Sequence, residues 1–322
     1  MARSVRAVAA VGSIGGAAPR GDRPEPGPPR HFLDVDQYSS EELRDILDLG
    51  FAYKGGRRRD RPLAGKTLAL IFEKPSTRTR VSFEVAMRQL GGDTIVLGTA
   101  DSQLGRGETI ADTARTLSAY CDAIVIRTFA HSDVEELAAA ASVPVVNALT
   151  DDHHPCQALA DLLTLRNAFG TLEGIRLAYV GDGNNVANSL LEAGALAGMD
   201  VVVACPPGYE PDVLGSVTHD AREAVEGAHA VYTDVWVSMG DEAEQAARAA
   251  AFAGYQVDEA LFALARPDAI FLHCLPAHRG QEVSAAVIDG PRSAVWRQAA
   301  NRESTEEALL YTLVSENREE TS

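Results

Sequence analysis

The stretch Phe72-Glu73-Lys74-Pro75-Ser76-Thr77-Arg78-Thr79-Arg80 joins a short apolar run to a helical pattern. The run, residues 67–72, reads Thr-Leu-Ala-Leu-Ile-Phe and is typical of a buried strand. Beyond Arg80, apolar residues recur at helical spacing until Gly91-Gly92 interrupts the pattern. The sequence here predicts a strand, a turn and a helix in direct succession.

The turn at residues 76–80 combines hydroxyl groups, backbone N–H groups at a helix start, and two guanidinium groups. A helix N-terminus offers unpaired N–H donors and the positive end of the helix dipole, which suits a phosphate. Arginine adds bidentate pairing to phosphate oxygens. A serine N-cap beside solvated arginines is the alternative that a lone Ser-Thr-Arg would favour. The order strand, hydroxyl-rich turn, arginine, helix favours an anion site.

The length and composition favour a two-lobed enzyme. A chain of 322 residues is too long for one small core, so we expect two α/β lobes. A hydrophobic content of 46% fits a soluble globular enzyme, and no apolar run approaches the roughly 18–20 residues that cross a bilayer. The widely spaced cysteines form no C-x-x-C pair. They argue against a zinc ribbon or a disulfide scaffold and favour a reducing compartment such as the cytoplasm.

The net charge of −17 disfavours nucleic acid and anionic membranes as partners. An anionic substrate is still compatible with this charge, because distant acids are screened beyond a Debye length of about 8 Å. A guanidinium about 4 Å from a phosphate contributes roughly 4 kcal/mol per charge pair at an effective dielectric near 20. A few local arginines therefore decide whether an anion binds.

Alternating strand and helix patterns predict parallel sheets with helices on both faces, in two doubly wound lobes. Residues 1–30 lack any period and predict a disordered extension, for which a targeting segment and a non-functional tail both stay open. We expect domains at 31–170 and 171–300, and a helix in 301–322 that packs back on the first lobe. Ser39-Ser40-Glu41-Glu42 predicts a capped helix start. The predicted strands are 67–72, 94–97, 123–127, 144–148, 176–180, 200–204, 229–233 and 269–273, and the predicted helices are 108–120, 132–141, 155–168, 185–197, 219–226, 241–249 and 304–314.

Several polar residues follow predicted strands, where parallel sheets bind their ligands. Arg127 ends one strand, and His154 precedes a proline at the start of the helix 155–168. A zinc site is the alternative for the His and Cys residues near positions 153–156 and 273–278, but their spacing does not match a structural zinc site, so we predict no metal. Asp234 follows another strand and suits an amino-acid ammonium group.

The turn Gly181-Asp182-Gly183-Asn184-Asn185 resembles a dinucleotide-binding turn, with Val186 at the third glycine position. No acidic residue ends the next strand, which makes a nicotinamide site the weaker interpretation. The segment 101–108 is polar and glycine-rich, which by itself indicates only a surface loop.

The motif K-P-S-T-R-T-R followed by S-F-E resembles the carbamoyl-phosphate loop of the aspartate/ornithine carbamoyltransferase family. The later motif H-P-C-Q resembles the segment of that family that holds the carbamoyl group. The motifs G-D-G-N-N, D-x-x-x-S-M-G and H-C-L-P are similar to the ornithine branch of the family, and the resemblance runs from about residue 31 to residue 313. It implies contacts to carbamoyl phosphate from Ser76, Thr77, Arg78, Thr79, Gln103, Arg127, His154, Gln157, Cys274, Leu275 and Arg302, and contacts to ornithine from Asn185, Asp234, Ser238 and Met239.

The resemblance also implies a reaction, in which a carbamoyl group passes from carbamoyl phosphate to the δ-amine of ornithine. Arg127, His154, Asp234 and Cys274 would be its catalytic residues, with no cofactor and in a homotrimer. A related carbamoyltransferase acting on putrescine or an acylated ornithine stays open, as does a catalytically silent regulatory subunit. The chain departs from the family at Glu306-Glu307, where Gln-Lys is usual.

Overall fold

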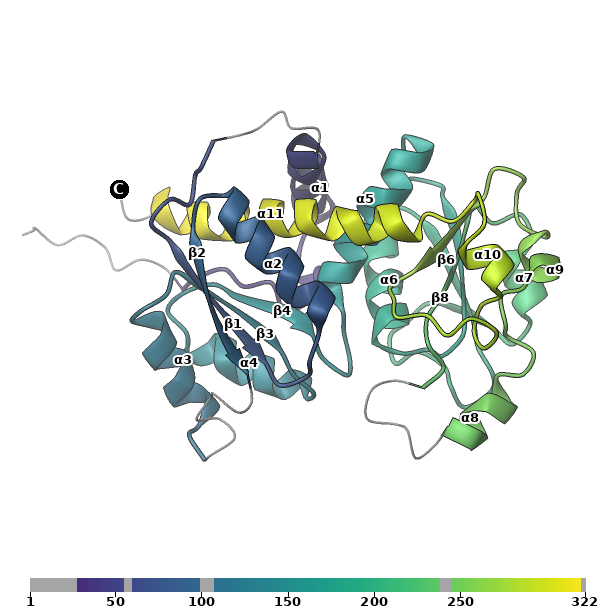
Figure 1. The fold of residues 1–322 in the computed structure, drawn as a ribbon, viewed down its shortest axis with the longest axis horizontal. Helices are drawn as coiled ribbons and strands as arrows, with labels where there is room; N and C mark the ends of the chain where they lie inside the picture. Colours follow the sequence, from purple (N-terminus) through teal and green to yellow (C-terminus); the bar gives the residue numbers. More distant parts are fainter. Residues whose placement is uncertain (1–27, 55–59, 99–106, 238–244, 320–322) are drawn as a thin grey trace, which may run out of the picture.

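Two parallel sheets form the framework of the computed structural model, which describes residues 28–54, 60–98, 107–237 and 245–319 (Figure 1). The strand order is β2-β1-β3-β4 in the first sheet and β7-β6-β5-β8-β9 in the second. The strands are β1 Thr67–Phe72, β2 Asp93–Gly98, β3 Ala123–Arg127, β4 Val145–Leu149, β5 Arg176–Val180, β6 Asp200–Ala204, β7 Ser216–Thr218, β8 Ala230–Thr233 and β9 Ile270–His273. The helices are η1 Val35–Gln37, α1 Ser40–Lys54, α2 Thr77–Gln89, α3 Ile110–Ser118, α4 His131–Ala140, α5 Pro155–Phe169, α6 Asn185–Leu196, α7 Ala221–Val225, α8 Gln245–Ala251, α9 Glu259–Phe262, α10 Ala285–Ile288 and α11 Val295–Glu319.

The first sheet and its helices, which we call the first lobe, have a core on each face of the sheet. Because neighbouring side chains of a strand point to opposite faces, Leu68 and Leu70 of β1 pack against α1, α2, α5 and α11. Ala69 and Ile71 pack instead against α3 and α4. Each face of the strand buries apolar side chains, which explains why residues 67–72 read as a continuous apolar run.

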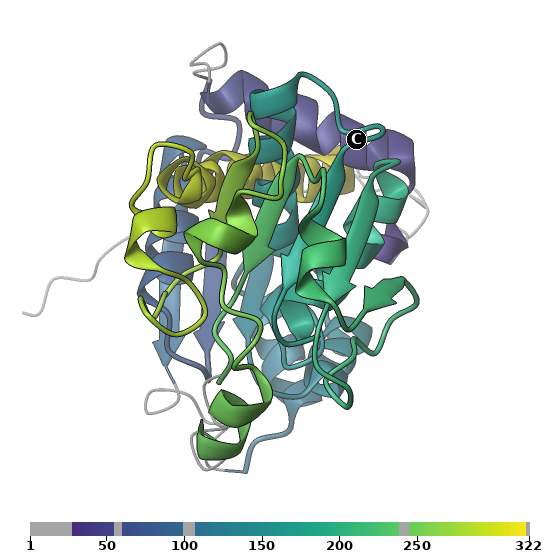
Figure 2. The ribbon, with the colours of Figure 1, turned by 90° about the vertical axis from the view of Figure 1, so that its right-hand side faces the viewer.

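The second sheet and its helices, the second lobe, follow the same rule. Leu177 and Tyr179 of β5 pack on the α6 side, whereas Ala178 and Val180 pack on the side of α7, α9 and α10. Figure 2, turned by 90°, places this lobe in front of the first. The predicted doubly wound α/β architecture is therefore confirmed, with helices on both faces of both sheets.

The last helix, α11, corrects one prediction. It begins at Val295, whereas the sequence pattern predicted a helix over 304–314, so Arg302 lies inside the helix rather than before it. The first turns of α11 bury the polar side chains of Gln298 and Asn301, and this interrupts the apolar period on which the prediction depended. The helix packs back on the first lobe as expected, against α1, α2 and α5 (Figure 1).

Most other predicted elements agree with the structure to within one or two residues at each end. Ser39 and Glu42 form the predicted cap, since the N–H and hydroxyl of Ser39 both donate to the Glu42 carboxylate at 2.8 Å. Strand β7 was missed because it is short, lies at the sheet edge and is mostly exposed. Residues 241–244 of one predicted helix lie outside the described residues. Across the described ranges, none of the helices combines the length and apolar character that spanning a membrane requires.

Candidate functional site

The first lobe places the predicted anion-binding turn where its strand order reverses. Strand β2 lies on one side of β1 in the sheet, and β3 lies on the other side. At such a reversal the carboxyl ends of the two central strands, here β1 and β3, flank a crevice. The last residues of these strands, Phe72 and Arg127, are paired in the sheet. Beyond β1, Ser76 caps α2, and its hydroxyl oxygen accepts a hydrogen bond from the Thr79 N–H at 3.2 Å. The predicted strand, turn and helix are confirmed here, and the helix start faces the crevice.

Positive charge gathers beside this turn. Burial, together with the charges of Arg302 and Arg78, lowers the pKa of Arg127 to about 10, which leaves it protonated at neutral pH. Burial and the same set of guanidiniums lower the pKa of His154 well below its usual value, so its imidazole is neutral. Within the described ranges, Arg127 Nε and His154 Nδ1 are buried and have no hydrogen-bond partner. Such atoms favour a bound ligand that supplies acceptor oxygens.

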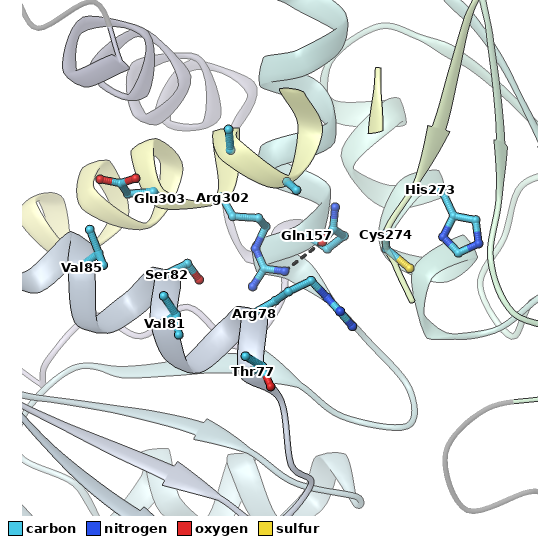
Figure 3. A pocket seen from close by; sticks show the side chains of 12 residues that line it. Thr77, Arg78, Val81, Ser82, Val85, Gln157, His273, Cys274, Arg302 and Glu303 are labelled. Atoms are coloured by element: carbon cyan, nitrogen blue, oxygen red, sulfur yellow. Dashed lines mark hydrogen bonds between the residues drawn. The ribbon is translucent and has the colours of Figure 1, made fainter. Parts of the chain in front are cut away.

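Arg302 reaches the same turn from α11. Its guanidinium donates to Gln157 Oε1 at 2.8 Å and to the Thr79 hydroxyl at 3.4 Å, and it also donates to Glu306 Oε1 at 2.8 Å from Nη2. Figure 3 shows Arg302 and Arg78 converging from α11 and α2, with Cys274 of the second lobe across from them. These side chains line a cavity of about 330 Å³.

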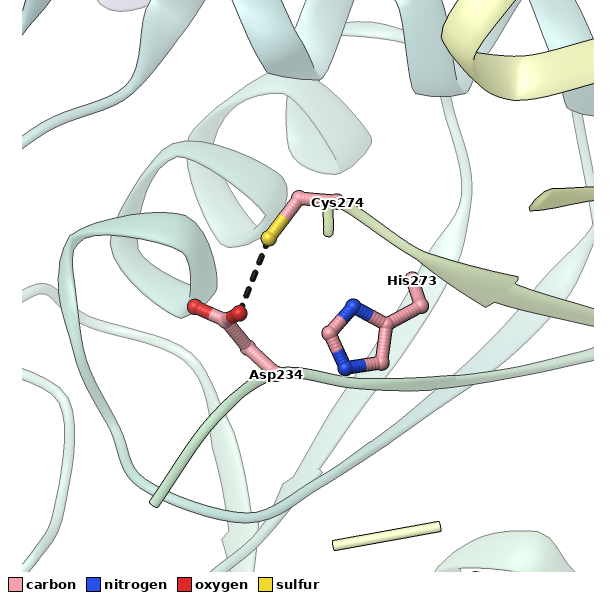
Figure 4. Close-up of side chains that lie close together, drawn as sticks. All are labelled: Asp234, His273 and Cys274. Atoms are coloured by element: carbon pink, nitrogen blue, oxygen red, sulfur yellow. Dashed lines mark hydrogen bonds between the residues drawn. The ribbon is translucent and has the colours of Figure 1, made fainter. Parts of the chain in front are cut away.

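The second lobe has its own strand reversal, between β5 and β8. Asp234 follows β8 and is buried, and Asn184 follows β5 as the N-cap of α6. The Asn184 side chain donates from Nδ2 to one Asp234 oxygen at 3.0 Å, while the Cys274 thiol donates to the other at 2.9 Å (Figure 4). Burial and the Asp234 carboxylate raise the pKa of Cys274 well above its usual value, so it stays a thiol.

Leu275 connects the two lobes. Its φ of +62° is unusual for a residue with a side chain, and its N–H donates to His273 Nδ1 at 2.9 Å. His273 Nε2 faces the buried Glu282 carboxylate at 3.2 Å, an arrangement that fixes the proton on Nε2. The Leu275 carbonyl is thereby turned toward the first lobe, where it accepts a hydrogen bond from Arg78 Nη2 at 2.9 Å.

A zinc site is the alternative to the predicted absence of a metal, but the ligand atoms of Asp234, His273, Cys274 and Cys156 make other contacts. Asp234, His273 and Cys274 lie close enough to share an ion, but zinc needs a thiolate and a free imidazole nitrogen. Cys274 is a thiol bonded to Asp234, and both His273 nitrogens have partners. Cys156 donates to the Asn147 carbonyl at 3.3 Å.

His153 forms a separate cluster with carboxylates at the seam between the lobes. Its Nδ1 lies 2.6 Å from Asp34 and 3.4 Å from Glu192 of α6. The shorter distance is below the separation of about 3.3 Å between two ligands of one zinc ion at bond lengths near 2.0–2.1 Å, so Asp34 and His153 are too close together to be ligands of the same ion.

Most of the predicted site residues come together at the facing strand ends, but Asn185 does not join Asp234. The Asn185 amide donates to the Thr150 carbonyl at 2.6 Å, so its predicted ornithine contact stays a prediction. Sequence reasoning missed Asn184, although an asparagine before a helical run is a recognisable N-cap signal. Gln103, Ser238 and Met239 lie outside the described residues. The residues that the structure gathers are Ser76, Thr77, Arg78, Thr79, Arg127, His154, Gln157, Asp234, Cys274, Leu275 and Arg302.

Comparisons with known proteins find matches that span both lobes. Residues 30–167 match the profile described as "Aspartate/ornithine carbamoyltransferase, carbamoyl-P binding domain", and residues 173–313 match "Aspartate/ornithine carbamoyltransferase, Asp/Orn binding domain". The ornithine carbamoyltransferase of Parafrankia sp. is 57% identical over 307 residues, which cover 89% of this chain and 96% of that protein. The one from Methanothermobacter thermautotrophicus is 55% identical over 302 residues, covering 89% and 99%.

Solved structures agree with these sequence matches. The structure of ornithine carbamoyltransferase from Pyrococcus furiosus matches with a TM-score of 0.84 and 51% identity, covering 88% of this chain and 96% of that one. The anabolic ornithine carbamoyltransferase from Campylobacter jejuni matches with a TM-score of 0.85 and 36% identity, covering 89% and 99%.

Proposed function

This chain belongs to the aspartate/ornithine carbamoyltransferase family, and we propose that it transfers the carbamoyl group of carbamoyl phosphate to the δ-amine of L-ornithine. The products are L-citrulline and phosphate. The observation that carries this proposal is the meeting of two strand-end sites, one rich in guanidiniums and one built around Asp234, through the Arg78–Leu275 hydrogen bond. An anionic donor and an amine acceptor need those two environments side by side.

The first lobe would bind carbamoyl phosphate. Ser76, Thr77, Arg78 and Thr79 supply hydroxyls, a guanidinium and the N-terminus of α2 to the phosphate. Gln157 lies next to this turn because Arg302 contacts both Gln157 and Thr79. Leu275 turns its carbonyl toward the same place, where it can accept from the carbamoyl NH₂ group.

The carbonyl carbon would then be attacked by the ornithine δ-nitrogen. A C–N bond forms, the carbon–oxygen bond to phosphate breaks, the phosphate leaves with the electron pair, and the proton released by the nitrogen passes to the leaving phosphate. Arg127, the neutral His154 imidazole and Thr79 would stabilise the oxygen as the carbon becomes tetrahedral. One such donor is typically worth about 2.7–4 kcal/mol. Holding amine and carbonyl within about 3–3.5 Å supplies much of the remaining acceleration.

The second lobe would bind ornithine. Asp234 offers a carboxylate to an ammonium group, and its oxygens are oriented by Asn184 and Cys274. We assign Asn185, Ser238 and Met239 to the α-amino and α-carboxyl groups, in line with the sequence motifs. Asp234 and Cys274 together would deliver the δ-amine in its uncharged form, which is the nucleophilic one.

We also propose domain boundaries, an oligomeric state and a cellular location for this chain. Residues 31–170 would form the carbamoyl-phosphate domain and 171–300 the ornithine domain, with 301–322 returning to the first. The resemblance of the sequence motifs to the family supports a homotrimer. Four free cysteines support the cytoplasm, where the enzyme would serve arginine biosynthesis.

An acceptor panel tests the proposed function. The purified chain is incubated with carbamoyl phosphate and ornithine, and in parallel with putrescine, aspartate or acetylornithine. We expect steady citrulline formation with ornithine and little product with the other acceptors. Preference for putrescine or acetylornithine would replace the substrate assignment, and binding of carbamoyl phosphate without turnover of any acceptor would indicate a regulatory subunit.

A further inference from the structure

Glu306 is a buried carboxylate that faces the site from the interior of α11. It is 1% exposed, and its Oε1 accepts hydrogen bonds from Arg302 Nε at 3.1 Å and Arg302 Nη2 at 2.8 Å. The same guanidinium contacts Thr79, which belongs to the N-terminal turn of α2. Arg302 therefore stands between a carboxylate on one side and the anion-binding turn on the other.

We propose that Glu306 is a positioning residue for Arg302 and that carbamoyl-phosphate binding drives proton uptake by this carboxylate. The inference rests on the proposed function, because it takes the turn at Thr79 as the phosphate site. A phosphate bound there and the Glu306 carboxylate would share one guanidinium. Two anions on one cation repel each other, and the buried carboxylate can relieve the repulsion by taking a proton, whereas the phosphate is fixed by its other contacts.

The surroundings allow this exchange near neutral pH. Burial raises the pKa of Glu306 to about 7, against the opposing effect of Arg302. On its own helix, Glu303 is the other carboxylate facing it. From α5, Cys156 faces the same carboxylate, and burial raises the pKa of this thiol, so Cys156 stays neutral.

A second buried carboxyl, Asp161, titrates in the same pH range and must be separated from Glu306. Burial raises its pKa to about 7, and it accepts hydrogen bonds from Gln157 and Gln298. Within the described residues Asp161 makes no hydrogen bond with Arg302, and a change confined to Glu306 leaves it in place. Glu306→Gln removes the titration while keeping the shape and one acceptor oxygen for Arg302.

Calorimetry of carbamoyl-phosphate binding at pH 7.5, in buffers of different ionisation enthalpy, measures the protons taken up per site. We expect uptake of a fraction of a proton in the wild-type chain and a clear decrease in Glu306→Gln. The matched control is Glu307→Gln, one residue further along α11, which should keep the wild-type value. Equal uptake in wild type and Glu306→Gln would overturn the proposal, as would no uptake in wild type.

The affinity gives a second readout that a purely structural role would not produce. Wild type and Glu306→Gln should bind carbamoyl phosphate with similar affinity near pH 6, where Glu306 is protonated. As the pH rises to 8.5, the affinity of wild type should fall relative to that of Glu306→Gln by up to about tenfold, which corresponds to a change of one pKa unit on binding. A constant ratio between the two proteins across this range would contradict the proposal. The wild-type citrulline assay is independent of these measurements, so failure of the proposed function is recognised separately.

Discussion

The Nη2 of Arg78 donates a hydrogen bond to the Leu275 carbonyl at 2.9 Å, and this contact joins the start of α2 in the first lobe to the loop after β9 in the second. Both partners belong to motifs that the sequence assigns to substrate binding. The contact shows that the two strand-end sites face each other across one short distance. The Arg78 guanidinium would therefore both bind the substrate and hold the two lobes together.

Arg78→Ala should remove this contact and one phosphate ligand together. We expect kcat to fall on the order of 10²–10³-fold, the usual effect of losing one donor to the developing charge, with Tm changed by no more than about 2 °C because the side chain is exposed. Citrulline formation and thermal unfolding measure the two effects. Arg80→Ala is the matched control, because Arg80 is exposed and pairs with Glu84 on the same helix. Near-wild-type turnover in Arg78→Ala would refute the phosphate assignment.

Asn184 caps helix α6 and also donates a hydrogen bond to Asp234, and two substitutions separate these roles. Asn184→Ala should destabilise the protein by about 1 kcal/mol, because the cap hydrogen bonds to Val186 and Ala187 are lost. Asn184→Asp keeps an acceptor for the cap but replaces the donor to Asp234 by a like charge. We expect urea unfolding to show only partial recovery of stability, because the two carboxylates repel each other, while KM for ornithine stays raised at least several-fold. A normal KM in Asn184→Asp would show that orientation of Asp234 is unimportant.

The Cys274 thiol should be slow to react with iodoacetamide at pH 8, since burial and Asp234 raise its pKa well above the usual value and little thiolate forms. Asp234→Asn removes the negative charge, which should lower this pKa and increase the alkylation rate several-fold. Mass spectrometry of the peptide that contains Cys274 follows the reaction, and Cys121 in the same sample serves as the internal reference. Unchanged or slower alkylation in Asp234→Asn would contradict the electrostatic explanation.

The His153 cluster should make stability depend on alkaline pH. Burial lowers the pKa of His153, but Asp34 and Glu192 outweigh it and raise the pKa to about 10. The unfolded value is near 6.5, so the stabilisation is complete below about pH 6.5 and is lost as the pH rises through 10. His153→Gln should lower the free energy of unfolding by about 1–3 kcal/mol at pH 7, because it removes the charged partner of the buried Asp34 and the partly buried Glu192. Urea unfolding from pH 7 to 10 should show that the difference in free energy of unfolding between wild type and His153→Gln becomes smaller. A constant difference would contradict the raised pKa of His153.

Much of the fold and site was predictable because continuous apolar strands end in polar motifs. Residues 67–72 and 123–127 have the predicted bounds, and Arg127 and Asp234 stand at strand ends as expected. The start of α11 was not predictable in this way, because between Val295 and Ala308 its buried side chains, such as Gln298 and Arg302, are polar.

Long-range side-chain contacts also lie beyond sequence patterns. Nothing local indicates that the Asn185 amide bonds to Thr150, or that Glu306 accepts from Arg302 beside the site. Such contacts depend on how the two lobes and α11 pack together, which is decided by the whole fold rather than by a period within one segment.

The position of Arg302 on α11 has a consequence for how the protein is made. Gln298 ties the same helix to the second lobe through the His273 N–H and to α5 through Asp161, so one late segment completes both halves of the crevice. A growing polypeptide on the ribosome cannot assemble the guanidinium set, nor complete the first lobe's core against α11, until residue 302 and the rest of this helix have been synthesised and docked. Catalytic activity would thus be acquired only at the final stage of synthesis and folding, and chains that terminate before residue 302 would be inactive.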